Sequence, residues 1–148
     1  MQKKDVIAAA CRQLEQRLDA LNEQLADIEQ ARNNETKSSA GDKYETSREM
    51  MQREADQIEA RKLHTRDLLQ RIHQFDPVTA SITVQPGCLI HTNRGWYFLA
   101  VPLGKIKVGT ETCFALSTDA PLGAQLLGKK TGDRFLFRDS EIEIQGIQ

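Results

Sequence analysis

The sequence predicts an α+β protein in which two long helices precede a small sheet, and two observations support this prediction. Residues 1–76 contain no proline and a single glycine, Gly41, whereas all four prolines and the other eight glycines lie in residues 77–148. The apolar spacing changes at the same point, from intervals of three and four residues to alternation. We therefore expect a helical domain over residues 1–76, ended by Pro77, and a sheet domain over residues 77–148.

Two apolar seams predict the helices. The first seam has alternating spacings of four and three: Ile7, Cys11, Leu14, Leu18, Leu21, Leu25 and Ile28. The second is weaker because Lys62 interrupts it: Met51, Ala55, Ile58, Thr65, Leu69 and Ile72. A period of 3.5 residues is typical of coiled coils, and charged residues crowd the remaining faces. We expect the two helices to bury their seams against each other.

The segment between the seams, NNETKSSAGDKYET, is rich in small and polar residues that favour a turn. A connection this short makes the two helices antiparallel. Arms of about 35 residues, rising about 1.5 Å per residue, give a rod of roughly 50 Å. The turn then lies at the far end of the rod as an acidic tip near residues 38–46, and any chemistry of the hairpin must lie there.

Short apolar or alternating runs in the second half predict an antiparallel sheet. The runs are Ser81–Gln85, Cys88–Thr92, Trp96–Val101, Thr112–Leu116, Arg134–Phe137 and Glu141–Ile147. The tripeptide Asn93-Arg94-Gly95 suits a hairpin turn. One short helix is expected in PLGAQLLG, with Asp119 near its cap, Pro121 in its first turn and Gly128 at its end. We expect this helix to pack on the sheet.

Composition argues against several classes of protein. A formal net charge of -1 does not suit a protein that coats duplex nucleic acid, so we expect no independent sequence-specific nucleic-acid binding. No run approaches the roughly 20 apolar residues of a membrane span, which predicts a cytoplasmic protein without a membrane partner. The three cysteines form no CxxC pair and predict neither a disulfide framework nor a zinc site: Cys11, Cys88 and Cys113.

Two stretches of the sequence resemble one protein family. The run APLGAQLLGKKTGDRFLF, followed by EIEIQGI, is similar to the closing part of the Gre transcript-cleavage factors. There a Ser-Pro-Leu-Gly run leads into a short helix, Leu-Leu-Gly-Lys-Lys and a Gly-Asp pair. GDKYETSRE resembles the tip of the same family, where Gly-Asp is followed three residues later by Glu. Segment order and lengths match over essentially the whole chain, which implies an FKBP-like fold for residues 77–148.

The resemblance implies a factor that binds bacterial RNA polymerase and stimulates cleavage of backtracked transcripts, which rescues stalled elongation. The C-terminal domain would hold the rim of the secondary channel, with Asp119, Ala120 and Pro121 in the position of the family's rim-binding segment. Asp42 and Glu45 would help to hold a Mg²⁺ ion, shared with polymerase carboxylates, at the RNA 3′ end. The chain would activate the polymerase's own hydrolytic activity without a complete active site or a cofactor of its own, and its contact with DNA would be indirect.

The chemistry of two carboxylates at the tip fits this role. A hard divalent ion prefers oxygen ligands, and paired metal ions stabilise the attacking and leaving oxygens of phosphodiester hydrolysis. Asp42 and Glu45 are three residues apart and would share one face of a helix. The same spacing also fits a capping box, with Asp42 as the N-cap. Arg32, Lys37, Lys43 and Arg48 would either steer the tip toward RNA phosphates or simply form a soluble surface.

Two further interpretations remain. Lys43 and Thr46 replace the Leu and Asn that commonly flank the acidic pair in the family, which suits a regulator that occupies the channel without stimulating cleavage. Alternatively, the chain is an FKBP-like binding or isomerase module that dimerises through its coiled coil, and the acidic tip is incidental. A Cys88–His91 nucleophile and base is not expected, because a spacing of three in a strand points the two side chains to opposite faces.

Overall fold

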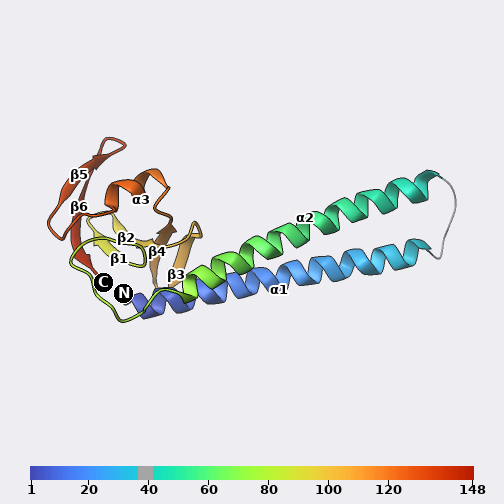
Figure 1. Ribbon diagram of the computed structural model, residues 1–148, viewed down its shortest axis with the longest axis horizontal. Coiled ribbons are helices and arrows are strands. Elements are labelled where there is room, and N and C mark those ends of the chain that lie inside the picture. Colours follow the sequence, from blue (N-terminus) through green and yellow to red (C-terminus); the bar gives the residue numbers. More distant parts are fainter. Residues whose placement is uncertain (37–41) are drawn as a thin grey trace. The chain divides into compact units, whose positions relative to one another are not determined.

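The computed structural model describes residues 1–36 and 42–148, without the side chains of residues 36, 42 and 43. Two long helices come first, followed by strands and one short helix (Figure 1). The elements in chain order are α1 Lys3–Thr36, α2 Asp42–His73, β1 Leu89–Thr92, β2 Gly95–Leu99, β3 Gly104–Val108, β4 Glu111–Leu116, α3 Pro121–Leu126, β5 Arg134–Phe137 and β6 Ser140–Ile147. The predicted α+β layout is confirmed. The chain forms two compact units, one of Met1–Gln13 with Gln70–Gln148 and one of Leu14–Leu69.

The Leu14–Leu69 unit is an antiparallel pair of helices that run side by side (Figure 1). Leu21 and Ile28 of α1 form one buried cluster with Ala55 and Ile58 of α2, and Leu25 and Met51 pack against it. These six residues all belong to the two predicted seams. The coiled-coil pairing is therefore confirmed in this unit.

Polar residues interrupt the seam of α2 at the predicted place. Lys62 is buried on the seam, and its Nζ lies 3.7 Å from Oε1 of Glu59. Thr65 is also buried and donates its hydroxyl to the carbonyl of Arg61 over 2.8 Å. A polar residue at a seam position weakens a coiled coil but fixes its register. Leu68 is more deeply buried than Leu69, the residue that the heptad pattern had placed on the seam.

In the other unit, both ends of the helical hairpin contact the sheet. Lys3 donates its Nζ to the carbonyl of Thr79 over 2.5 Å and its backbone N–H to Oε1 of Gln148 over 3.1 Å. The rings of Phe75 and Phe98 meet edge to face, with centroids 6.0 Å apart. The predicted domain boundary between residues 76 and 77 stays a prediction, since these contacts come from residues on its N-terminal side.

A compact turn follows the end of α2. One oxygen of Asp76 accepts the N–H of Val78 over 2.8 Å, and the other accepts the hydroxyl of Thr79. These hydrogen bonds, the Thr79 hydroxyl first and the Val78 N–H second, lower the pKa of the Asp76 carboxyl below its ordinary value of 3.8. The turn redirects the chain toward the sheet, with Pro77 at the position where the helix cannot continue.

The sheet has six strands in the order β3-β4-β2-β1-β6-β5. Four of the neighbouring pairs are antiparallel as predicted, but β2 and β4 are parallel, with Tyr97 opposite Phe114. The parallel pair arises because the chain leaves β2, forms β3 at the edge and returns through a hairpin. β4 then lies between β3 and β2. The sheet is therefore mixed, and the prediction of a wholly antiparallel sheet was wrong at this pair.

Two strand predictions were also wrong. The run Ser81–Gln85 forms one isolated bridge, Thr83 to Lys130, because its neighbour is the loop after α3 and not a strand; Val84 is buried and hydrogen-bonded to the backbone of Gly128 and Lys129. The edge strand β3 was missed, although its sequence, GKIKV, alternates and buries Ile106. The predicted hairpin turn is confirmed. It joins β1 to β2, and Thr92 pairs with Gly95, whose φ is 113°.

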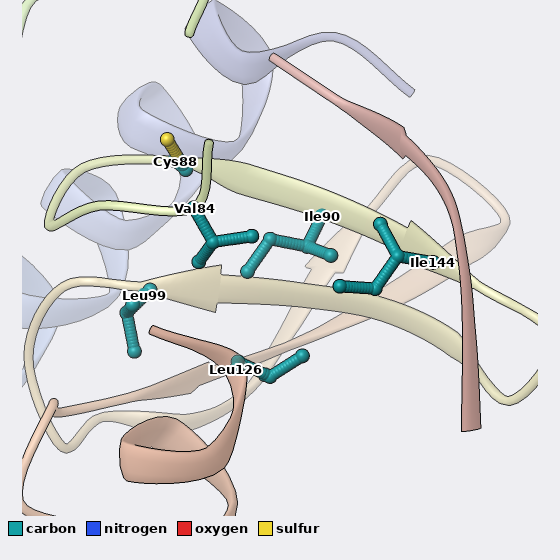
Figure 2. Packing of buried hydrophobic residues seen from close by; sticks show 6 residues of the cluster. All are labelled: Val84, Cys88, Ile90, Leu99, Leu126 and Ile144. Atoms are coloured by element: carbon teal, nitrogen blue, oxygen red, sulfur yellow. The ribbon is translucent and has the colours of Figure 1, made fainter. Parts of the chain in front are cut away.

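The core of the sheet unit lies between one face of the sheet and α3 (Figure 2). Its buried members are Val84, Cys88, Ile90, Leu99, Leu126 and Ile144. The helix contributes Leu126, which is fully buried, while the adjacent Leu127 is 46% exposed. Cys88 and Cys113 are buried as small apolar residues, and burial raises the pKa of the Cys113 thiol to about 12.

We expect Leu126→Ala to lower the free energy of unfolding by about 2–5 kcal/mol, because it leaves a cavity between α3 and the sheet. Leu127→Ala removes the same atoms at the surface and should cost about 0.5 kcal/mol or less. Urea denaturation of the two variants measures the difference. Equal losses would show that α3 does not close this core.

We expect Asp76→Asn to lower the melting temperature near pH 7, because it removes the charge that the Val78 and Thr79 donors stabilise. Since the folded pKa of Asp76 is depressed, this stabilisation is complete above 3.8 and is lost as the pH falls through the lower folded value. Thermal melts of parent and variant over a descending pH series should converge in acid. A gap that widens in acid would contradict the assignment.

Candidate functional site

The predicted acidic tip lies where α1 ends and α2 begins. α1 ends at Thr36 and α2 begins at Asp42, so both predicted site residues, Asp42 and Glu45, belong to the first turn of α2. Glu45 is exposed. Residues 38–41 of the predicted tip lie outside the described residues, as does the side chain of Asp42. The joint role of the two carboxylates stays a prediction.

Cross-helix hydrogen bonds join the two helices just below the turn. The hydroxyl of Ser47 donates to Oε1 of Glu35 over 2.9 Å. Farther from this end of the two helices, Nη1 of Arg32 in α1 donates to Oε1 of Gln52 in α2 over 3.2 Å. These bonds hold the first turns of α2 against the last turns of α1. Glu45 therefore lies on a helix that is bonded to α1 two residues further along, at Ser47.

A groove of about 410 Å³ lies beside these bonds. It is lined by Glu29, Arg32, Asn33, Glu35, Tyr44, Arg48 and Met51. Both described arginines that the sequence suggested as RNA-steering residues, Arg32 and Arg48, thus lie next to carboxylates and not in a purely cationic patch. Lys37 lies outside the described residues, and the side chain of Lys43 is not described.

The chemistry of the tip suits a divalent cation only in part. Exposed carboxylate oxygens, such as those of Glu45, are the ligands that Mg²⁺ prefers. Over residues 1–36 and 42–148, no group of three or more His, Cys, Asp or Glu side chains is arranged to hold a metal ion. The side chain of Asp42 lies outside the described part of the chain, so the ligand set at the tip stays a prediction.

The predicted partner-binding segment lies in the loop between β4 and α3. Asp119 and Pro121 are exposed and Ala120 is half-buried. Ala120 is the N-cap residue of α3 and donates its N–H to the carbonyl of Ser117 over 3.2 Å, while Pro121 occupies the first turn. The loop therefore presents two of its three predicted contact residues to solvent, and its contact with a partner stays a prediction.

A buried glycine makes this loop possible. A Cβ on Gly123 would lie 2.0 Å from the carbonyl oxygen of Ser117. Only a residue without a side chain lets the loop fold back so closely over the first turn of α3. The sequence pattern placed Gly123 inside a helix but gave no sign of this contact.

The Cys88–His91 pair is not a nucleophile and base. Cys88 lies in the core, where its thiol approaches the carbonyl of Thr83 at 3.8 Å. His91 lies within β1, three residues after Cys88, and stacks on Trp96 with ring centroids 4.2 Å apart. The side chains are engaged in separate environments, as the strand spacing predicted.

Comparisons with known proteins find matches among solved structures. No family model matches the chain, and no curated protein matches it. A solved structure of the transcription factor Gfh1 is 21% identical to the chain, with a TM-score of 0.40. The match covers 94% of this chain and 93% of that chain. In the part of the chain that the structure describes, no helix is long and apolar enough to cross a membrane.

We expect Gly123→Ala to destabilise the protein by about 1–3 kcal/mol or more, because the new methyl group collides with a backbone oxygen that cannot rotate away. Gln125→Ala, at an exposed position of the same helix, is the control and should be nearly neutral. Thermal unfolding followed by circular dichroism compares the two. A Gly123→Ala protein as stable as the parent would show that the loop can move away from α3.

Proposed function

We propose that this protein is a Gre-like factor that enters the secondary channel of bacterial RNA polymerase and stimulates cleavage of backtracked transcripts. The observation that carries the proposal is the position of the GDKYET segment. The acidic residues that resemble the family's tip open the second helix of an antiparallel hairpin, and Glu45 is exposed there. The resemblance of residues 120–137 to the family's C-terminal domain supports the proposal independently.

The lengths of the helices suit a lever that acts at a distance. α1 has 34 residues and α2 has 32. At about 1.5 Å per residue, each is roughly 50 Å long. The seam between them supplies stiffness, since Leu21, Ile28 and Ile58 are buried together. A stiff hairpin can carry two carboxylates into a channel that a globular domain cannot enter.

The tip residues would complete an ion site that belongs mainly to the polymerase. Asp42 and Glu45 would add carboxylate oxygens to those of the polymerase and orient a water molecule near the RNA 3′ end. When bound, Mg²⁺ supplies charge stabilisation for phosphodiester hydrolysis. The chain contributes ligands to this reaction and no complete active site, so we class it as an activator and not as an enzyme.

The loop before α3 would provide the grip on the polymerase. Asp119 and Pro121 are exposed, and Gly123 holds the loop in one conformation. Binding and stimulation would then depend on different parts of the chain. The loop would supply affinity, whereas the tip carboxylates would act mainly in the transition state, where differential stabilisation accelerates the reaction.

A channel-binding regulator without cleavage activity is the second candidate. It is favoured by the residues around the acidic pair, because Lys43 places a cation between the two carboxylates in the sequence. The dimerising FKBP-like module has less support. The seam residues Leu21 and Ile58 are already buried within one chain and are not free to bind a second copy.

We expect the double change Asp42→Ala and Glu45→Ala to abolish cleavage stimulation while polymerase binding stays within about twofold of the parent, because the binding loop is unchanged. The hairpin should stay folded, since loss of a helix cap costs only about 1 kcal/mol. Stalled, backtracked complexes incubated with each protein show cleavage as shortened RNA, and retention on immobilised polymerase measures binding. A double variant that still shortens the RNA at the parent rate would rule out the cleavage proposal.

Two matched variants separate the roles of these residues. Asp42→Asn keeps a good N-cap but removes the charge, so it should fail nearly as completely as Ala if the carboxylate is a ligand, and should act like the parent if it only caps the helix. The pair Asp119→Ala and Pro121→Ala should lose binding and stimulation together. Parent-level binding by this variant would place the grip elsewhere.

A further inference from the structure

Two neighbouring strands, β2 and β4, carry a pair of aromatic rings, of which Phe114 is exposed and Tyr97 is half-buried. Tyr97 of β2 and Phe114 of β4 are directly opposite each other in the sheet, and their ring centroids are 6.3 Å apart. Phe114 is 47% exposed, although its neighbours Cys113 and Ala115 are buried on the other face of the strand. Tyr97 packs partly against the core beside Leu99. The pair therefore forms a firm apolar platform that α3 does not fully cover.

Cations flank the rings. Lys105 of β3 is opposite Phe114, and Lys107 is opposite Thr112, so both lysines lie on the same face as the rings and are exposed. Arg94 is exposed in the turn directly before β2; burial raises the pKa of the Tyr97 phenol, and the charge of Arg94 opposes this rise. We refer to Arg94, Tyr97, Lys105, Lys107 and Phe114 as the aromatic–cationic surface.

In the strands β2, β3 and β4 no carboxylate lies on the face of the rings. Glu111 is the only carboxylate in the sequences of β2, β3 and β4. It alternates with Thr112 and Phe114 to the opposite face, where its Oε2 lies 3.5 Å from the N-terminal amino group of Met1. Two lysines thus lie beside the rings and Arg94 lies directly before β2, on a chain whose formal net charge is -1.

An exposed ring beside a half-buried one on a sheet face, bordered by lysines, suits an unpaired strand of nucleic acid. Bases of any sequence can stack on aromatic faces while lysines and arginines contact the phosphates. A protein partner is less favoured, because lysine is depleted in protein interfaces. A duplex is less favoured because its bases are already stacked and cannot reach the rings. We infer that the aromatic–cationic surface binds single-stranded nucleic acid without sequence preference.

The test is fluorescence anisotropy with the full-length protein and labelled oligonucleotides of about a dozen nucleotides, a length within the usual range of single-strand sites. Single-stranded RNA, single-stranded DNA and the matching duplex are compared in EDTA, without polymerase, so the result does not depend on the proposed function. Both single strands should bind more tightly than the duplex. With three phosphate contacts, the logarithm of the association constant should fall against the logarithm of salt with a slope of about -2.

Three variants assign the binding to this surface. Phe114→Ala should weaken binding roughly tenfold by removing one stacked base. The pair Lys105→Gln and Lys107→Gln should reduce the salt slope to about -0.7, the value for one remaining contact. Lys4→Gln with Lys130→Gln makes the same change of charge elsewhere and should leave the slope near -2. Thermal melts check that all variants are folded.

Several outcomes would overturn the inference. One is the absence of oligonucleotide binding at the lowest salt, and another is a Phe114→Ala protein that is folded and binds like the parent. The inference would also be overturned if the Lys105→Gln and Lys107→Gln protein shows the same salt slope as the Lys4→Gln and Lys130→Gln control. If the parent binds no oligonucleotide but Phe114→Ala loses retention on the polymerase, the surface is a protein-docking site and the inference is wrong.

Discussion

The burial of one apolar stripe on each long helix is the constraint on which the hairpin depends. Between Leu14 and Leu69 the side chains outside the seams are mostly charged or amide groups, so each helix buries one stripe there. A helix of this kind is stable only beside a partner, and the partner here is the other arm of the same chain, through Leu21, Ile28 and Ile58. Pairing of the arms brings the end of α1 to the start of α2, where Ser47 donates to Glu35, and Glu45 lies in this first turn of α2.

This constraint explains which parts of the fold could be predicted from the sequence. A heptad pattern sustained over several turns has no other stable solution than a helix pair, so the hairpin was predictable. The strand β3 was not, because GKIKV has only one buried residue, Ile106, and lies at the edge of the sheet. The parallel pairing of β2 and β4 depends on where the returning strand inserts, and local sequence carries no information on that choice. The short alternating pattern of residues 81–85 also gave a wrong strand prediction, since Val84 is buried there without a ladder of paired strands.

The candidate sites also differ in how far the sequence alone could predict them. Glu45 and the loop at Asp119 each lie within one short segment, and a motif in that segment was enough to find them. The aromatic–cationic surface gathers residues from three strands and a turn, and only the register between β2, β4 and β3 brings them together. A partial signal existed in the sequence: Phe114 is a large apolar residue at the outward position of a strand, and two lysines alternate with Ile106 in the next. Without knowledge of the parallel pairing of β2 and β4, sequence reasoning could not place Tyr97 beside Phe114 in this surface.

Charge shows most clearly why the composition of a whole chain is a limited guide to its partners. A formal net charge of -1 argues against a protein that coats nucleic acid, and that argument holds for the molecule as a whole. It does not hold for a single face, because alternation along a strand sends neighbouring residues to opposite sides. In β4 the carboxylate of Glu111 is directed to one side, where it meets the amino group of Met1, while Phe114 and the lysines of β3 remain on the other. A nearly neutral chain can therefore present acidic residues at one helix start and a cationic surface on one sheet face, each suited to a different partner.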